Sequence, residues 1–254
     1  MFTPKGKFGW YEIMTSDTKA TGKFYSDVVG WTTQEMPSGD MPYTTFNLGN
    51  VGIAGMLQME GHSGWIGYIS VDDVDAHIPK IVEAGGKLWK PATDVPGMLR
   101  FAVLSDPQGA AIVVFTPDPK MPSPQRTESP TPGTIGWHEL YTTDIEGGFD
   151  FYNKLFAWTK VSDMDMGPMG TYRIFDEGDH KEMGDGGMMI KAPYIPVSCW
   201  NFYFNVDSIG AAVKRVESGG GKVLNGPMQV PGGGWIINGQ DPQGAMFSLV
   251  SSKE

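Results

Sequence analysis

The segment Gly9–Trp31, GWYEIMTSDTKATGKFYSDVVGW, is repeated later in the chain as Gly136–Trp158, GWHELYTTDIEGGFDFYNKLFAW. Both copies open with Gly-Trp-x-Glu, and both close with an aromatic pair followed by a last tryptophan. After the first seven residues, Ala20, Phe24 and Val28 recur at i, i+4 and i+8, which is typical of a helix that buries one side. The repeat therefore predicts a strand followed by an amphipathic helix, used twice.

Two further segments repeat in the same order. Trp65–Lys87 returns as Trp200–Lys222, and DPQGAAIVVF from Asp106 returns as DPQGAMFSLV from Asp241. Turn glycines and short alternating runs fill the remaining stretches and indicate hairpin-linked strands. Each half therefore has the pattern βαβββ-βαβββ. We predict an α+β fold from tandem duplication, in which each half forms a cup-shaped mixed sheet covered by helices on one face.

The segment between the halves, residues 116–132, has a different composition. It contains six prolines and no periodic apolar pattern, so it continues neither a sheet nor a helix. We predict one domain at 1–115, a Pro-rich linker at 116–132 and a second domain at 133–254.

Composition and charge narrow the class of protein. A net charge of −10 argues against a nucleic-acid partner, because such partners select for basic surfaces. No apolar run approaches the length that spans a bilayer, and the first residues lack the apolar core of a secretory signal. The single cysteine, Cys199, rules out an internal disulfide framework and a Cys-rich zinc site. We expect a cytoplasmic protein with no membrane contact, either a monomer or a homodimer.

The repeated motifs resemble those of the vicinal oxygen chelate superfamily, which includes glyoxalases, extradiol dioxygenases and bleomycin-resistance proteins. The likeness rests on the βαβββ repeat, the FYxxVxGW helix end, the VDDVDA helix start and the DPQG turn before a final strand. It covers almost the whole chain outside the linker. It implies the two-domain glyoxalase/bleomycin-resistance arrangement and the cup-shaped sheets more securely than it implies any one activity.

The resemblance also implies where a metal ion would bind. Metal-dependent members hold a divalent ion with His, Gln or Glu on the strands that line the cup. The matching positions here are Trp10, Ile66 and Val113 in the first half, and Trp137, Asn201 and Ser248 in the second. Indole and aliphatic groups donate no lone pair to a metal, and Ser and Asn do so poorly. We therefore predict no cofactor. A divalent metal would need unusual ligands such as Glu12, Glu139 or His138.

Strand alternation separates the side chains of each first strand into two faces. Trp10, Glu12 and Met14 share one face, as do Trp137, Glu139 and Tyr141, which places His138 on the opposite face, toward the helix. We predict aromatic-lined cups with Glu12 and Glu139 as polar anchors or catalytic groups. The predicted ligand-binding residues are Trp10, Met14, Tyr43, Trp65, Val113 and Phe115 in the first half, with Trp137, Tyr141, Tyr172, Trp200 and Ser248 in the second.

Three functions fit these features. The first is a metal-free protein that binds a small hydrophobic or aromatic molecule. The second is a metal-free isomerase or lyase in which Glu12 or Glu139 moves a proton. The third is a metal-dependent glyoxalase-type lyase or dioxygenase with unusual ligands. A further alternative gives the tryptophans only a packing role, with each glutamate bonded to an Arg, a Lys or backbone donors.

Overall fold

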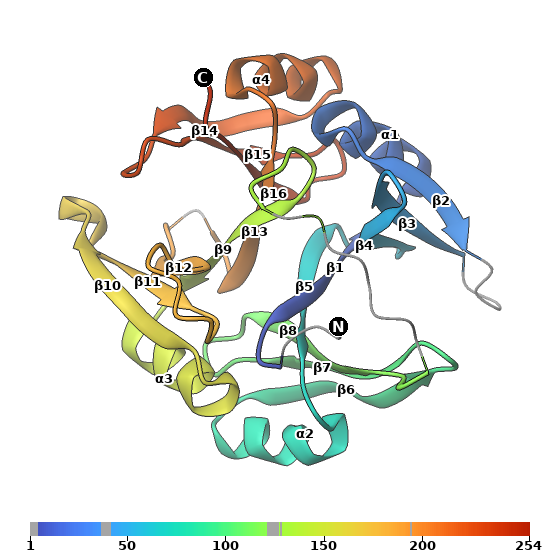
Figure 1. Cartoon of the computed structure of the whole chain (residues 1–254), viewed down its shortest axis with the longest axis vertical. Helices are drawn as coiled ribbons and strands as arrows, with labels where there is room; N and C mark the ends of the chain where they lie inside the picture. Colours follow the sequence, from blue (N-terminus) through green and yellow to red (C-terminus); the bar gives the residue numbers. More distant parts are fainter. Residues whose placement is uncertain (1–4, 37–41, 121–126, 128, 194) are drawn as a thin grey trace. The chain divides into compact units, whose positions relative to one another are not determined.

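The computed structural model describes residues 5–36, 42–120, 127, 129–193 and 195–254. These residues form four successive βαβββ modules (Figure 1). The first comprises β1 (Phe8–Thr15), α1 (Thr18–Val29), β2 (Thr32–Met36), β3 (Tyr43–Leu48) and β4 (Val51–Gln58). The second comprises β5 (Gly64–Ser70), α2 (Val74–Glu83), β6 (Lys87–Val95), β7 (Leu99–Ser105) and β8 (Ala111–Pro117).

The second half repeats this order. The third module comprises β9 (Ile135–Thr142), α3 (Ile145–Phe156), β10 (Thr159–Asp165), a short 3₁₀ turn (Gly167–Met169), β11 (Thr171–Asp176) and β12 (Gly186–Ile190). The fourth comprises β13 (Cys199–Asn205), α4 (Ile209–Ser218), β14 (Lys222–Gln229), β15 (Trp235–Gln240) and β16 (Met246–Ser251). The predicted α+β fold of two repeated halves is confirmed.

Each half contributes one mixed eight-stranded sheet. The strand order is β2-β3-β4-β1-β5-β8-β7-β6 in the first half and β10-β11-β12-β9-β13-β16-β15-β14 in the second. In each module the first strand pairs parallel to the last, and the other neighbours are antiparallel. A helical crossover returns each module's chain to its own sheet, so one face of that module is covered by a helix.

The helices begin where short polar side chains cap them. Asp17, Asp73, Asp144 and Ser208 each accept a hydrogen bond from the backbone N–H three residues later. The first helix ends at Gly30, which has φ +92°, a left-handed conformation that glycine adopts without strain. The same chemistry in all four modules explains why the helices start at equivalent positions.

Contacts between Cα atoms divide the chain into two compact units that do not follow the two halves of the sequence. One unit holds the described residues of Met1–Trp10, Ile66–Pro124 and His138–Trp200, and therefore mostly the second and third modules. The other holds those of Tyr11–Trp65, Gln125–Trp137 and Asn201–Glu254, and therefore mostly the first and fourth. The predicted domain boundaries at 1–115 and 133–254 stay a prediction. Residues 121–126 and 128 of the predicted linker lie outside the described residues.

Within each unit, the tyrosine of a helix's Phe-Tyr pair is hydrogen-bonded to the aspartate of a DPQG turn. In one unit the Tyr152 hydroxyl on α3 donates to Asp106 Oδ2 at 3.2 Å, while Asp106 Oδ1 accepts backbone N–H groups of its own turn. In the other unit Tyr25 on α1 donates to Asp241 Oδ2 at 3.3 Å in the same way. Both carboxylates are buried, and desolvation raises the pKa of each. These motifs therefore join a module of one half to a module of the other.

An aromatic cluster surrounds each tyrosine. Tyr25 packs against Trp31, Phe46, Trp65, Phe204 and Phe247 at ring-centroid distances of 5.2–6.0 Å. Tyr152 packs against Trp158 at 4.7 Å and against Trp200 at 5.3 Å. The indole N–H groups also have partners, since Trp31 donates to the carbonyl of Gly133 and Trp158 to that of Gly6. The core of each unit therefore lies between its helices and the adjacent sheet face.

Candidate functional site

The two faces of β9 are distinguished by what each side chain contacts. His138 lies against the Phe8 ring at 4.5 Å, and the buried Leu140 faces Gly148 of α3. The helix side is therefore the side of His138 and Leu140, as the alternation predicted. Trp137, Glu139 and Tyr141 share the opposite face, which we call the Glu face.

Glu139 is the centre of a polar group on this face. Its side chain is buried, with 5% of its surface exposed, and its Oε1 accepts a hydrogen bond of 2.9 Å from the Tyr172 hydroxyl on β11. The tyrosine reaches the carboxylate by crossing β12 at Gly187, which is the register partner of Glu139. A Cβ at Gly187 would lie 2.2 Å from the Tyr172 hydroxyl. The absence of a side chain at Gly187 is therefore what lets Tyr172 lie across this strand.

The first half contains the same arrangement. Glu12 on β1 is 7% exposed and is the register partner of Gly55 on β4. A Cβ at Gly55 would lie 1.9 Å from the hydroxyl of Tyr43, the first residue of β3. The sequence could not give the direction of Tyr43 or Tyr172, whereas the structure places both across the glycine that pairs with the glutamate.

Cys199 and Lys191 belong to the electrostatic surroundings of Glu139. Burial raises the pKa of the Cys199 thiol to about 11, with the Glu139 carboxylate adding to the rise and the Lys191 ammonium opposing it. Lys191 donates from Nζ to the carbonyl of Ile195 at 2.7 Å. A thiol with so high a pKa is a poor nucleophile at neutral pH, so the group with chemistry to offer here is the Glu139–Tyr172 pair.

That pair can act in two ways. A carboxylate that accepts a tyrosine hydroxyl can bind a hydrogen-bond donor of a ligand, and it can also accept a proton from one. In the second half Tyr172 donates to Glu139, and in the first half the hydroxyl of Tyr43 lies beside Gly55, the register partner of Glu12.

The remaining predicted residues fall into four groups. Trp10, Met14, Trp137 and Tyr141 are partly exposed residues that alternation places on the same strand faces as the glutamates. Val113 and Phe115 on β8 are buried, and with Tyr68 they form a cluster in which the Tyr68 and Phe115 rings lie 6.1 Å apart. Ser248 is fully buried and is the register partner of Tyr203.

Trp65 and Trp200 lie elsewhere. Trp65 donates from Nε1 to the Tyr25 hydroxyl at 2.8 Å, and Trp200 donates to the Tyr152 hydroxyl at 2.9 Å. Both indoles therefore belong to the helix-side aromatic clusters, and Trp200 is only 6% exposed. This placement does not bring Trp65 or Trp200 onto the face that carries the glutamates.

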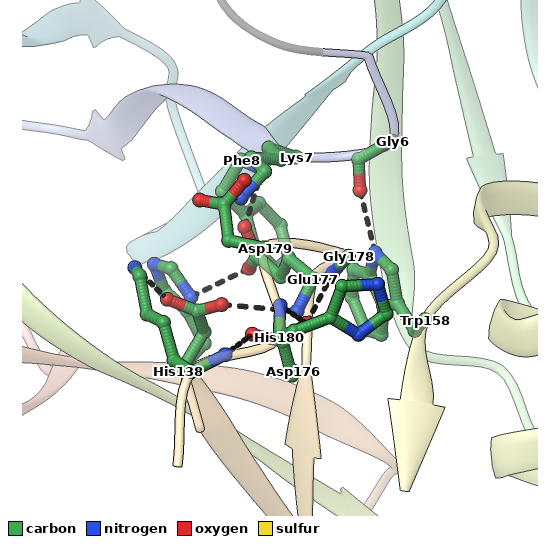
Figure 2. A network of polar contacts seen from close by, with 12 residues as sticks. Gly6, Lys7, Phe8, His138, Trp158, Asp176, Glu177, Gly178, Asp179 and His180 are labelled. Atoms are coloured by element: carbon green, nitrogen blue, oxygen red, sulfur yellow. Dashed lines mark hydrogen bonds and ion pairs between the residues drawn. The ribbon is translucent and has the colours of Figure 1, made fainter. Parts of the chain in front are cut away.

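His138 takes part in a second polar network, on the helix side of the sheet (Figure 2). Its Nδ1 lies 2.8 Å from Glu177 Oε1, and Glu177 Oε2 accepts the backbone N–H of Phe8 at 3.3 Å. The buried ammonium of Lys7 pairs with Asp179. These contacts join Lys7 and Phe8 to the β11–β12 hairpin, and the contacts of His138 with Phe8 and Glu177 indicate a structural role for it.

The positions that hold the metal in related proteins are not suited to a metal here. In the second half, Ser248 Oγ accepts hydrogen bonds of 2.7 Å from the side-chain amides of both Asn201 and Asn238. In the first half the matching positions carry Ile66 and Val113. His138 and Glu139 point to opposite faces of β9 and cannot bind one ion together. Across the described ranges, no three His, Cys, Asp or Glu side chains gather as a metal site requires.

A family model described as the Glyoxalase/Bleomycin resistance protein/Dioxygenase superfamily matches residues 7–114 and 134–249. The chain belongs to this superfamily. It is 32% identical over 254 residues to a Mycobacterium bovis protein named "Putative glyoxylase CFP32", covering 97% of this chain and 95% of that one. It is 30% identical over 272 residues to "Anthracycline biosynthesis protein DnrV" of Streptomyces peucetius, covering 100% and 95%.

Solved structures support the fold assignment at lower identity. A Mn(II)-bound glyoxalase from Novosphingobium aromaticivorans has a TM-score of 0.70 at 15% identity, covering 98% of this chain and 83% of that one. The 2,3-dioxygenase LapB from Pseudomonas sp. KL28 has a TM-score of 0.67 at 15% identity, covering 98% and 92%. These similarities concern the fold alone. Among the helices of the described ranges, none has the length and apolar character needed to cross a membrane.

Proposed function

We propose that this protein binds a small hydrophobic or aromatic molecule on the face of the sheet that carries Trp137, Glu139 and Tyr141, and does so without a metal. The observation that carries the proposal is the buried carboxylate of Glu139, hydrogen-bonded to Tyr172 on a face that also presents partly exposed aromatic side chains. Ligand sites commonly combine such apolar walls with a few fixed polar groups.

Two further observations support it. The side chains at the superfamily's metal positions are aliphatic, aromatic or already hydrogen-bonded to one another, so the chemistry of the donors favours an organic ligand over an ion. One relative is named for anthracycline biosynthesis, and anthracyclines are flat polycyclic aromatic compounds. That name is consistent with an aromatic ligand for this chain too.

Equilibrium dialysis with 2-methylnaphthalene tests the proposal directly. The wild-type chain should retain the probe, and Trp137→Ala should weaken retention because a half-buried indole on the Glu face is lost. Trp89→Ala is the matched control, because Trp89 is 55% exposed on the edge strand β6 and should not affect binding. Treatment with EDTA should leave retention unchanged. If a broad panel of flat apolar probes passes through unretained, the proposal is wrong.

A second candidate function uses the same pair as a proton-transfer device. The Tyr172 hydroxyl lies 2.9 Å from Glu139 Oε1, which is a distance for proton exchange between the two groups. A metal-free isomerase or lyase would then lose its turnover on Glu139→Gln while keeping its fold. Full activity in that variant would eliminate the catalytic role and leave binding as the function.

A further inference from the structure

A row of uncharged polar side chains crosses the sheet in the fourth module. Tyr203 on β13 is the register partner of Ser248, Ser248 that of Asn238, and Asn238 that of Asn225 on β14. Asn201, two residues before Tyr203, donates to Ser248 Oγ at 2.7 Å. Asn238 donates to the same oxygen at 2.7 Å and accepts from Asn225 at 3.1 Å. We call these five residues the amide row.

The amide row lies on the sheet face away from the helices. On β13, Phe204 lies 5.0 Å from Trp31 and 5.9 Å from Tyr25, so the even-numbered side chains pack against the helix-side cluster. Asn201 and Tyr203 therefore point the other way. The row runs from the buried Asn201, 3% exposed, to the exposed Asn225 at the edge strand.

The buried end of the row lacks one hydrogen bond. Asn201 Oδ1 is inaccessible to solvent and has no hydrogen-bond partner among the described residues. Turning the amide over would exchange its oxygen and nitrogen, but one of the two would still be unpaired. An unpaired buried amide atom costs about 1–3 kcal/mol, so the fold gains nothing from it unless another molecule supplies the partner.

The first half shows that the sheet does not need these polar groups. Its strands have the same register, in which Tyr68 pairs with Val113, Val113 with Val103, and Val103 with Lys90. Ile66 stands two residues before Tyr68, as Asn201 stands before Tyr203. Aliphatic side chains thus occupy, in the same fold, the three positions that Asn201, Ser248 and Asn238 hold in the second half.

We infer that the amide row binds the hydroxyl group of an uncharged, hydroxylated aromatic ligand. This inference rests on the proposed function and names the ligand class. A ligand hydroxyl donates to Asn201 Oδ1, which removes the unpaired acceptor. The amide row contains no cationic side chain, so the negative charge of an ionised ligand would have no partner in the row. The row should therefore bind the neutral form of the ligand more tightly than the ionised form.

The test measures how tightly the whole chain binds each of three probes: 2-naphthol, 2-methylnaphthalene and 2-naphthoate. One buried hydrogen bond is worth about 0.5–1.5 kcal/mol, so 2-naphthol should bind about twofold to tenfold more tightly than 2-methylnaphthalene. The charged 2-naphthoate should bind least. Asn201→Ile, which installs the residue of the first half, should abolish the preference for 2-naphthol and leave 2-methylnaphthalene binding within about twofold.

Controls separate this inference from the proposed function. Ile66→Val changes the matching position of the first half and should leave the preference intact. Asn201→Val removes the same acceptor with a smaller side chain and gives the same readout if Asn201→Ile fails to fold. Equal binding of 2-naphthol and 2-methylnaphthalene by the wild type overturns the inference alone, whereas no binding of any probe overturns the proposed function as well. A preference that persists in Asn201→Ile with a raised Tm means that Asn201 holds only a buried water, and overturns the inference.

Discussion

Replacing Gly187 by alanine should displace Tyr172 from Glu139. The new Cβ would lie 2.2 Å from both the hydroxyl oxygen and the Cζ atom of Tyr172, far inside any tolerated contact. Gly187 does not have the positive φ that would itself strain an alanine. The tyrosine ring is therefore the group that must move, and its 2.9 Å hydrogen bond to the carboxylate is lost.

The size of the effect follows from the charge and burial of Glu139. A hydrogen bond to a charged group contributes about 1.5–3 kcal/mol, and Glu139 is buried, with 5% of its surface exposed. We expect Gly187→Ala to lower the free energy of unfolding by about 2–3 kcal/mol. For a chain of this size, that lowers the Tm by roughly 4–12 °C.

A double-mutant cycle shows whether the ring contact is the cause. In a Tyr172→Ala background there is no ring to displace, so Gly187→Ala should change the unfolding free energy by less than about 0.5 kcal/mol. Gly64→Ala is the control, because a Cβ at Gly64 meets nothing within 4 Å, and it should be neutral or slightly stabilising. Urea unfolding followed by circular dichroism measures all variants. An equal loss with and without the tyrosine ring would refute the reasoning.

Three other perturbations have defined outcomes. Tyr25→Phe removes the hydrogen bond to Asp241, so urea unfolding should show a loss of about 1–3 kcal/mol, and no loss would contradict the role of this contact. Arg173→Met should lower stability by about 2–3 kcal/mol at pH 7, because the 5% exposed guanidinium bonds to Asp163 at 2.8 Å. Those bonds hold the pKa of Asp163 well below its usual value, so the wild type loses this stability gradually as pH falls from about 4 towards that lowered pKa, and the stabilities of the two proteins should converge over that range. Alkylation of Cys199 by iodoacetamide should accelerate about tenfold per pH unit up to a pKa of about 11, and a plateau near pH 9 in mass spectrometry would contradict its burial.

The sequence was sufficient to predict the modules but not which modules pack together. Repetition, helix caps and turn glycines gave four βαβββ units, because these signals are local. Tyr25, however, could have matched Asp106 or Asp241, since both turns have the same DPQG sequence. Only the structure shows that Tyr25 bonds to Asp241 and Tyr152 to Asp106. Identical motifs contain no information about which copy meets which.

Alternation was informative wherever a strand is regular. It placed His138 toward the helix, and His138 lies against Phe8 there. Applied along all of β13, alternation also places Trp200 on the helix side, because Trp200 shares a face with Phe202 and Phe204. The role of Trp200 in ligand binding rests only on its position at the start of the module and stays a prediction. The direction of Tyr172 required the register with β12, which the sequence does not contain.

Comparison of the two halves separates the features that both copies share from those that only one copy has. The glutamate, its glycine partner and the tyrosine near that glycine occur in both halves, so they belong to what the two copies have in common. The amide row occurs in one half, where the other has aliphatic groups in the same register. A feature needed to close the sheet would be required twice, because both sheets have the same strand order. The amide row is not required twice. Its polar groups are therefore better explained by recognition of a molecule than by folding, and the second half is the place to look for what distinguishes this protein's ligand.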